Sequence, residues 1–118
     1  MIVKKPTIII NTCRGDMQLL REICAGIEEE GILYEIMSDK EGTASALSVK
    51  ACEASMLGVG IGLCGDDVSL HIKGMNIRHG ENEMTTLLSH TAPDMTTARA
   101  LGANGARVIK RLPLRLPE

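Results

Sequence analysis

Aromatic side chains are nearly absent from this sequence: its 118 residues include one tyrosine, no phenylalanine and no tryptophan. Proteins that bind single-stranded nucleic acid stack the bases on aromatic rings, so this class is disfavoured. The formal net charge of −2 also provides no basic field that would attract phosphate. Hydrophobic residues still make up 44% of the chain, and seven methionines can fill irregular core spaces. We therefore predict one domain over residues 1–118 that does not bind nucleic acid.

Common nucleotide, metal and membrane motifs are missing as well. No Gly-Lys-Ser/Thr sequence is present to form a phosphate-binding loop, so the chain shows no nucleotide-hydrolysis machinery of its own. The apolar run at 8–10 is too short for a membrane span, and no signal peptide is visible. The cysteines form no C-x-x-C pair, and no zinc spacing occurs: they are Cys13, Cys24, Cys52 and Cys64. A reduced cytoplasmic compartment is expected.

Short apolar runs alternate with helical patterns along the chain. Strands are predicted over 6–11, 32–38, 58–64, 68–73 and 85–89, and helices over 16–30, 43–56 and 94–110. The first and third helices have Asp16 and Asp94 as candidate N-caps, and a polar loop is expected over 74–82. The order β-α-β-α-β-β-β-α predicts an α/β domain of two or three layers with a mostly parallel sheet.

A glycine motif in the third strand has two interpretations. Residues 60–65 match G-x-G-x-x-G, a dinucleotide-binding pattern whose glycines belong in a turn that opens a helix. Here the glycines fall inside a predicted strand that continues through a turn into another strand. Close packing of a helix over the glycines is therefore the favoured interpretation.

Cys13 is a candidate nucleophile, because it precedes a helix N-terminus where a thiolate is stabilised. A phosphatase-type loop would need arginine at the position of Leu19, and no histidine base can be placed near Cys13 from the sequence. A small α/β thiol enzyme using Cys13 remains a minority alternative. His71 alternates with polar residues in its strand and is expected to be half-exposed. The acidic pairs at 66–67 and 81/83 are expected to be solvated.

The end of the first helix carries negative charges that the helix dipole disfavours. Glu28, Glu29 and Glu30 stand at the helix C-terminus, where a carboxylate is disfavoured by roughly 0.3–1 kcal/mol. Gly31 suits the left-handed residue that closes the helix. A solvated acidic helix end is the more ordinary interpretation of this run. The alternative is that one of these acids meets a cation at an interface.

Helical geometry selects Glu29 as that acid. The core face of the helix consists of Leu19, Leu20, Ile23, Cys24 and Ile27. Glu29 points away from this face, on the side of Glu22, Ala25 and Gly26, while Glu28 and Glu30 flank the face. Glycine inside a helix costs about 1 kcal/mol relative to alanine. The small residues therefore indicate that another surface comes close to the helix here.

Basic residues gather at the other end of the chain: Arg107, Lys110, Arg111 and Arg115. Cations suit a helix C-terminus, which is the favoured interpretation. Docking against an acidic partner is the alternative.

Two sets of residues resemble one known family over essentially the whole chain. Ile10, Cys13, Arg21-Glu22 and the segment 26–32 (GIEEEGI) are similar to the N-terminal part of the small subunit of the diol/glycerol dehydratase-reactivating factor. The pattern Gly102-x-Asn104-x-Ala106-Arg107, continuing to Arg115, is similar to that family's C-terminal helix and tail. The middle, 38–93, matches mainly in its alternation of elements.

The resemblance implies a non-catalytic subunit with the fold of the dehydratase medium (β) subunit. Its partner would be a large ATP-hydrolysing subunit, in a heterotetramer of two large and two small subunits. The complex would release damaged cobalamin from the adenosylcobalamin-dependent dehydratase by subunit displacement, with the small subunit binding the dehydratase large (α) subunit transiently. It would work in the cytoplasm or inside a bacterial microcompartment. The chain would have no nucleotide or cobalamin site of its own.

The resemblance also assigns site residues. The middle glutamate of the acidic run would bind a divalent metal at the interface with the large subunit, which maps onto Glu29, and Mg²⁺ suits a carboxylate ligand. Glu22, Ala25, Gly26, Glu28, Glu30, Arg107 and Arg115 are candidate partner-interface residues. A medium or small subunit of the dehydratase itself remains an alternative, although the short stretch before Pro6 favours reactivation.

Overall fold

The elements follow the predicted order, and most of their bounds lie within two residues of the predicted ones. The computed structural model describes residues 6–76 and 84–110. The elements are β1 (Ile8–Cys13), α1 (Met17–Glu29), β2 (Tyr34–Ser38), α2 (Ala44–Ala54), β3 (Val59–Cys64), β4 (Asp67–Asn76), β5 (Met84–Thr91) and α3 (Met95–Ile109). One difference is that β4 continues to Asn76, where a loop was expected from Gly74.

The sheet is mixed, although we expected it to be mostly parallel. Its strand order is β2-β1-β3-β4-β5. β1 pairs in parallel with β2 and β3, whereas β4 pairs antiparallel with both β3 and β5. Parallel neighbours need a long crossover, which α1 and α2 provide. Only Gly65 and Asp66 separate β3 from β4, so that pair must be antiparallel.

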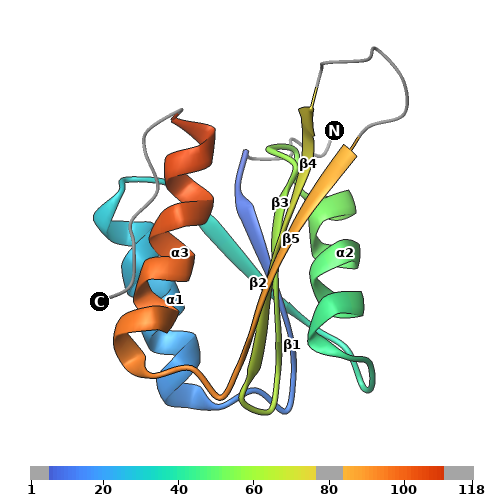
Figure 1. Cartoon of the computed structure of the whole chain (residues 1–118), viewed down its shortest axis with the longest axis vertical. Helices are drawn as coiled ribbons and strands as arrows, with labels where there is room; N and C mark the ends of the chain where they lie inside the picture. The colour runs from blue at the N-terminus through green and yellow to red at the C-terminus, as the bar shows by residue number, and fades with distance from the viewer. Residues whose placement is uncertain (1–5, 77–83, 111–118) are drawn as a thin grey trace, which may run out of the picture.

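The three helices cover both faces of the sheet and make three layers. α1 and α3 lie side by side on one face, and α2 lies alone on the other (Figure 1). The main core lies between the sheet and the α1–α3 layer, and its fully buried side chains include Ile8, Ile23 and Ile61. The α/β class is therefore confirmed, in its three-layer form.

Two glycines of β3 bring α2 close to the sheet. A Cβ atom on Gly60 would overlap the backbone of Cys52, and one on Gly62 would overlap the carbonyl oxygen of Ala44. The interpretation of residues 60–65 as a helix-packing surface is confirmed, since these glycines lie within a strand and not in a turn that opens a helix.

His71 is more buried than we expected. It lies on the face of the sheet that α2 covers, it is 8% exposed, and its Nδ1 atom has no hydrogen-bond partner among the described residues. Burial lowers the pKa of His71 below the usual value of 6.5. Its expected half-exposure was wrong because the alternation in β4 separates two packed faces, not a packed face from a solvated one.

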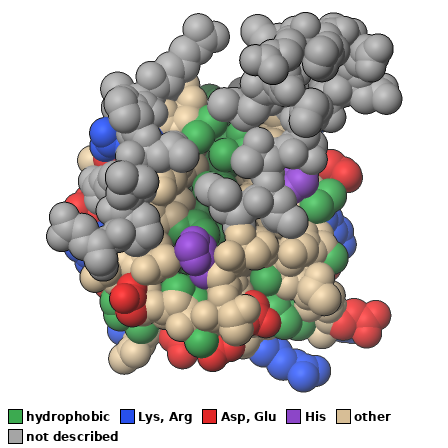
Figure 2. Space-filling view, in the orientation of Figure 1, with side chains coloured by type: hydrophobic (Ala, Val, Ile, Leu, Met, Phe, Trp, Pro, Cys, Tyr) green, Lys and Arg blue, Asp and Glu red, His purple; other side chains and the backbone are tan. Residues whose placement is uncertain are grey.

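The helix caps agree with the sequence. Asp16 accepts hydrogen bonds from the backbone of Gln18 and Leu19, and Asp94 accepts one from Thr97, so both predicted N-caps are confirmed. In the space-filling view, histidine, apolar and uncharged side chains fill the middle of the surface that the described residues form, and most charged side chains lie toward its margins (Figure 2). Within the described residues, no helix has the length and apolar content needed to cross a membrane.

Candidate metal and partner-binding site

The C-terminal half of α1 packs directly against α3. A Cβ atom on Gly26 would overlap the carbonyl oxygen of Arg99, and one on Gly102 would overlap that of Ile23. The two backbones are therefore in contact through these glycines. The surface that comes close to Gly26 is thus the chain's own third helix. Gly26 is buried in this contact and is not available to a partner, which corrects our expectation for this residue.

Glu30 is held by two cations of α3. Its carboxylate lies 2.9 Å from Nη1 of Arg107 and 3.0 Å from Nζ of Lys110, and its side chain is only 7% exposed. Lys110 also donates a hydrogen bond of 2.6 Å to the Glu30 carbonyl oxygen. The hydrogen bond from Lys110, supported by Arg107, lowers the pKa of Glu30 from 4.5 to about 2. These contacts join the ends of the two helices.

The ion pairs of Glu30 should make the free energy of unfolding depend on pH. Because folding lowers its pKa, the ionised carboxylate stabilises the native state above about pH 4.5, and this contribution is lost as the pH falls toward 2. We expect Glu30→Gln to lower the free energy of unfolding by about 1–3 kcal/mol at pH 7. The deficit should shrink below pH 4.5 in urea titrations followed by circular dichroism. Glu41→Gln, at an exposed loop position, is the control. A deficit that is constant from pH 7 to pH 2 would contradict this assignment.

Glu28 has a different partner, on the other side of α1. It accepts a hydrogen bond of 2.9 Å from the hydroxyl of Tyr34, the first residue of β2. This bond raises the pKa of Tyr34, because loss of the phenolic proton would break it and set two negative charges side by side. Glu28 therefore ties the end of α1 to the edge of the sheet.

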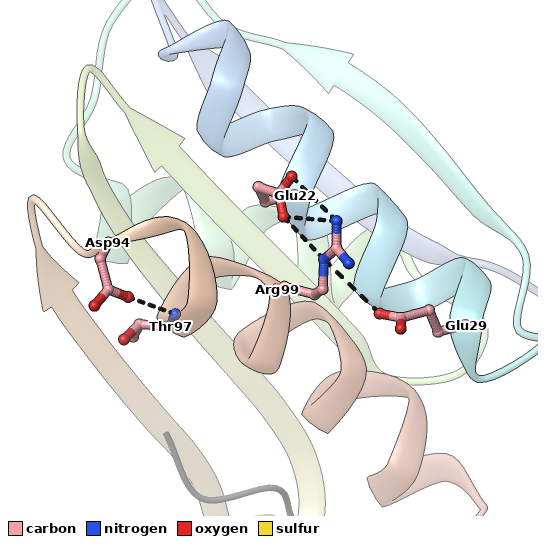
Figure 3. A network of polar contacts seen from close by, with 5 residues as sticks. All are labelled: Glu22, Glu29, Asp94, Thr97 and Arg99. Atoms are coloured by element: carbon pink, nitrogen blue, oxygen red, sulfur yellow. Dashed lines mark hydrogen bonds and ion pairs between the residues drawn. The ribbon is translucent and has the colours of Figure 1, made fainter. Parts of the chain in front are cut away.

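Arg99 of α3 lies between Glu22 and Glu29 of α1 (Figure 3). Its Nε atom donates to Oε1 of Glu22 at 2.8 Å, and its Nη2 atom donates to Oε2 at 3.2 Å, so this pair is bidentate. Glu29 is farther away, with its Oε1 atom 3.9 Å from Nε of Arg99. The contact with Glu22 raises the pKa of Arg99. Glu29 is therefore part of the same network, and its side chain is 42% exposed.

The arrangement can offer one carboxylate to a cation. Hard cations such as Mg²⁺ bind through one or two carboxylates and complete their shell with water or other oxygen ligands. Glu29 has the right donor atoms, whereas both oxygens of Glu22 already accept hydrogen bonds from Arg99. In the described part of the chain, no group of three or more His, Cys, Asp or Glu residues could hold a metal. A metal at Glu29 would therefore need further ligands from outside this set.

The structure brings together most of the site residues that the sequence indicated. Glu22, Glu29, Glu30 and Arg107 all lie at the α1–α3 contact, and Ala25 is half-buried on the same helix. Arg115 lies outside the described residues. Sequence reasoning missed Arg99, the residue that binds Glu22. The sequence did contain a pattern that indicates this contact, because Arg99, Arg107 and Lys110 are spaced to lie along one side of a helix.

The second candidate site, at Cys13, has no described histidine within reach. The Cys13 side chain is 5% exposed, and in the sheet register the residue is paired with Cys64. His71 is aligned with Gly60, four residues away along β3, which corresponds to about 13 Å. His90 lies on β5, three strands away from β1, which corresponds to about 14 Å. Both separations are far beyond hydrogen-bond reach. His79 and the acidic pair at 81/83 lie outside the described residues.

Comparison with known proteins gives one consistent result. The family model for the dehydratase medium subunit matches residues 5–115. The propanediol dehydratase-reactivating factor small subunit of Salmonella typhimurium is 30% identical over 93% of this chain and 90% of its own length. The diol dehydratase-reactivating factor small subunit of Klebsiella michiganensis is 32% identical over 93% of this chain and 84% of its own.

A solved structure agrees with these relatives. A chain in the structure of the diol dehydratase-reactivating factor complexed with ADP and Mg²⁺ is 30% identical, with a TM-score of 0.76. The match covers 96% of this chain and 100% of that one. The similarity thus extends over nearly the full length of both chains, in sequence and in fold. The chain therefore belongs to the dehydratase medium-subunit family, together with the small subunits of diol and propanediol dehydratase-reactivating factors.

Proposed function

We propose that this chain is the non-catalytic small subunit of a reactivating factor and binds an ATP-hydrolysing large subunit through Glu29 and a shared divalent cation. The observation that carries the proposal is the position of Glu29. Its carboxylate is 42% exposed at the junction of α1 and α3, and Arg99 is 3.9 Å away. The neighbouring acids are bonded inside the chain, Glu28 to Tyr34 and Glu30 to Arg107. Glu29 pairs with Arg99 at the α1–α3 junction, and its exposed side chain supports a contact with another molecule.

Mg²⁺ suits this position on chemical grounds. Its preferred ligands are oxygen atoms, and proteins usually hold it with only one or two carboxylates while it keeps several waters. The relative of known structure was solved with ADP and Mg²⁺, which supports a magnesium requirement in such complexes. When bound, the cation would bridge the two subunits. On this chain, Arg99 would hold the neighbouring Glu22 and lie beside Glu29 at the surface that faces the partner.

The complex would act on an adenosylcobalamin-dependent diol or glycerol dehydratase. In this proposal the small subunit has the fold of the dehydratase medium subunit and takes its place transiently on the dehydratase large subunit. Damaged cobalamin would leave through the opening made in this way. ATP hydrolysis in the large subunit would drive the exchange. The family match over residues 5–115 supports this mimicry of the medium subunit.

The test is the magnesium dependence of complex formation. The affinity of the chain for its cognate large subunit is measured by calorimetry with Mg²⁺ and with a chelator. We expect removal of Mg²⁺ to weaken binding about ten-fold or more, and Glu29→Gln to remove that dependence. Glu53→Gln is the matched control, because Glu53 is exposed on α2, on the opposite face of the sheet. Equal affinities of the Glu29→Gln variant and the parent chain in both buffers would refute the metal role.

One alternative has support from the family description, which names a dehydratase medium subunit. In that case the chain would be part of the enzyme itself. Co-purification separates the two functions. An ATPase large subunit in the purified complex supports reactivation, and a cobalamin-containing dehydratase supports the enzyme subunit.

A further inference from the structure

The outer edge of β2 has unpaired backbone groups. Within the described residues, β2 is the end strand of the sheet and pairs only with β1. The amide of Ile8 donates to the Leu33 carbonyl oxygen at 3.0 Å, and the amide of Asp39 donates to the Thr12 carbonyl oxygen at 3.1 Å. Because consecutive residues of a strand point their backbone groups to opposite sides, the odd-numbered residues of β2 face β1. The N–H and C=O groups of Tyr34, Ile36 and Ser38 therefore point outward.

The side chains along this edge are unusually apolar for a free strand. Ile36 is 50% exposed, and Leu33, just before the strand, is 61% exposed. Soluble proteins normally prevent such edges from pairing with other strands by placing lysine, proline or a bulge there. β2 contains none of these devices, and Glu35 is its one charged residue. An edge with this composition is suited to pairing with another strand.

The edge is continuous with the acidic end of α1. The hydroxyl of Tyr34 donates to Glu28, the residue directly before Glu29. The register of β2 with β1 aligns Tyr34 with Ile8 and Ile36 with Ile10, so both side chains lie on the sheet face that α1 covers. A partner that binds at Glu29 would therefore reach the edge by passing the end of α1 at Glu28.

The backbone and charges of the edge indicate what kind of segment would bind there. Outward backbone groups at alternate positions require an extended segment, which adds to the sheet as a further strand. Glu28 and Glu35 are both exposed and would favour lysine or arginine in that segment. A second copy of this chain is disfavoured, because its edge would carry the same acidic residues, Glu28 and Glu35, and like charges repel.

We propose that the free edge of β2 pairs with an extended, basic segment of the large subunit, so that the interface at Glu29 continues onto the sheet. This inference rests on the proposed function. Its signature is an alternating pattern of amide protection along β2. The amides of Tyr34, Ile36 and Ser38 gain new partners in the complex, whereas those of Glu35 and Met37 are already bonded to β1.

The experiment is residue-resolved hydrogen exchange on the free chain and on its complex with the cognate large subunit in Mg²⁺. The amides of Tyr34, Ile36 and Ser38 should exchange at least about ten-fold more slowly in the complex. A complex in which these three amides are unchanged, or in which all β2 amides slow equally, overturns the strand-pairing inference and leaves the proposed function standing. If no complex forms, the proposed function fails and the inference fails with it.

A pair of variants tests the same edge through affinity. Ile36→Lys places on the edge a positive charge that opposes strand pairing. Met56→Lys places the same charge at a 59% exposed position between α2 and β3. We expect the first to weaken the complex about ten-fold and the second to leave it unchanged, with equal thermal midpoints for both free chains. Equal affinities of the two variants would overturn the inference. So would dimerisation of the free parent chain with protection of the same three amides, because a second copy would then be the occupant.

Discussion

Ile27→Asp is expected to leave the chain unfolded at neutral pH. The Ile27 side chain is fully buried in the core between α1 and the sheet. An ionised carboxylate at this position would have neither water nor a cation to stabilise it, and the apolar contacts of the isoleucine would be lost as well. The combined cost exceeds about 5 kcal/mol, which is the whole stability of many small domains. Circular dichroism should show the loss of the cooperative thermal transition.

The control for this substitution lies on the same helix. Gln18→Asp adds the same side chain and the same charge at an exposed position in the first turn of α1, where a negative charge is favourable. Its thermal midpoint should equal that of the parent chain or rise slightly. A folded Ile27→Asp protein with a parent-like midpoint would show that the core face of α1 is assigned wrongly. The comparison also separates folding defects from the interface effects expected at Glu29, two residues further along.

The sequence predicted α1 well because one pattern determined it. Its apolar residues recur at helical spacing, Asp16 marks its start, and Gly31 has the left-handed backbone expected at its end, with φ of 75°. The same geometry places Glu29 away from the sheet, but its side of α1 faces α3, where Arg99 lies 3.9 Å away. Local patterns of this kind need no knowledge of the rest of the chain.

The partners of the acidic residues could not be predicted in the same way. Glu22 is 77 residues from Arg99 in sequence, and Glu30 is the same distance from Arg107. Only the packing of α3 beside α1 brings these charges together, and that packing depends on the whole sheet. We therefore attributed the room around Gly26 to another molecule, when the chain's own helix fills it. His71 was misjudged for a related reason, since the burial of its strand face depends on α2.

The direct contact of α1 and α3 leads to a test in which two identical substitutions should have different outcomes. Gly26→Ala is expected to destabilise the protein by about 2–3 kcal/mol, because the new methyl group would overlap the Arg99 carbonyl oxygen and force the helices apart. Helix propensity alone predicts the opposite, a gain of about 1 kcal/mol. Urea titrations, which measure the free energy of unfolding, decide between the expected loss and the expected gain in stability.

Gly105→Ala supplies the matched control within α3. A Cβ atom there would meet side-chain carbon atoms and no backbone, at 3.3 Å from Cγ1 of Val59 and 3.4 Å from Cδ1 of Leu70. These side chains can shift by a few tenths of an ångström, so stability should lie between that of the parent and about 1 kcal/mol above it. Equal responses at Gly26 and Gly105 would contradict the close contact. If the contact is as described, separating the helices in Gly26→Ala also draws Arg99 away from Glu22 and Glu29. Partner binding should then weaken even under conditions where the variant remains folded.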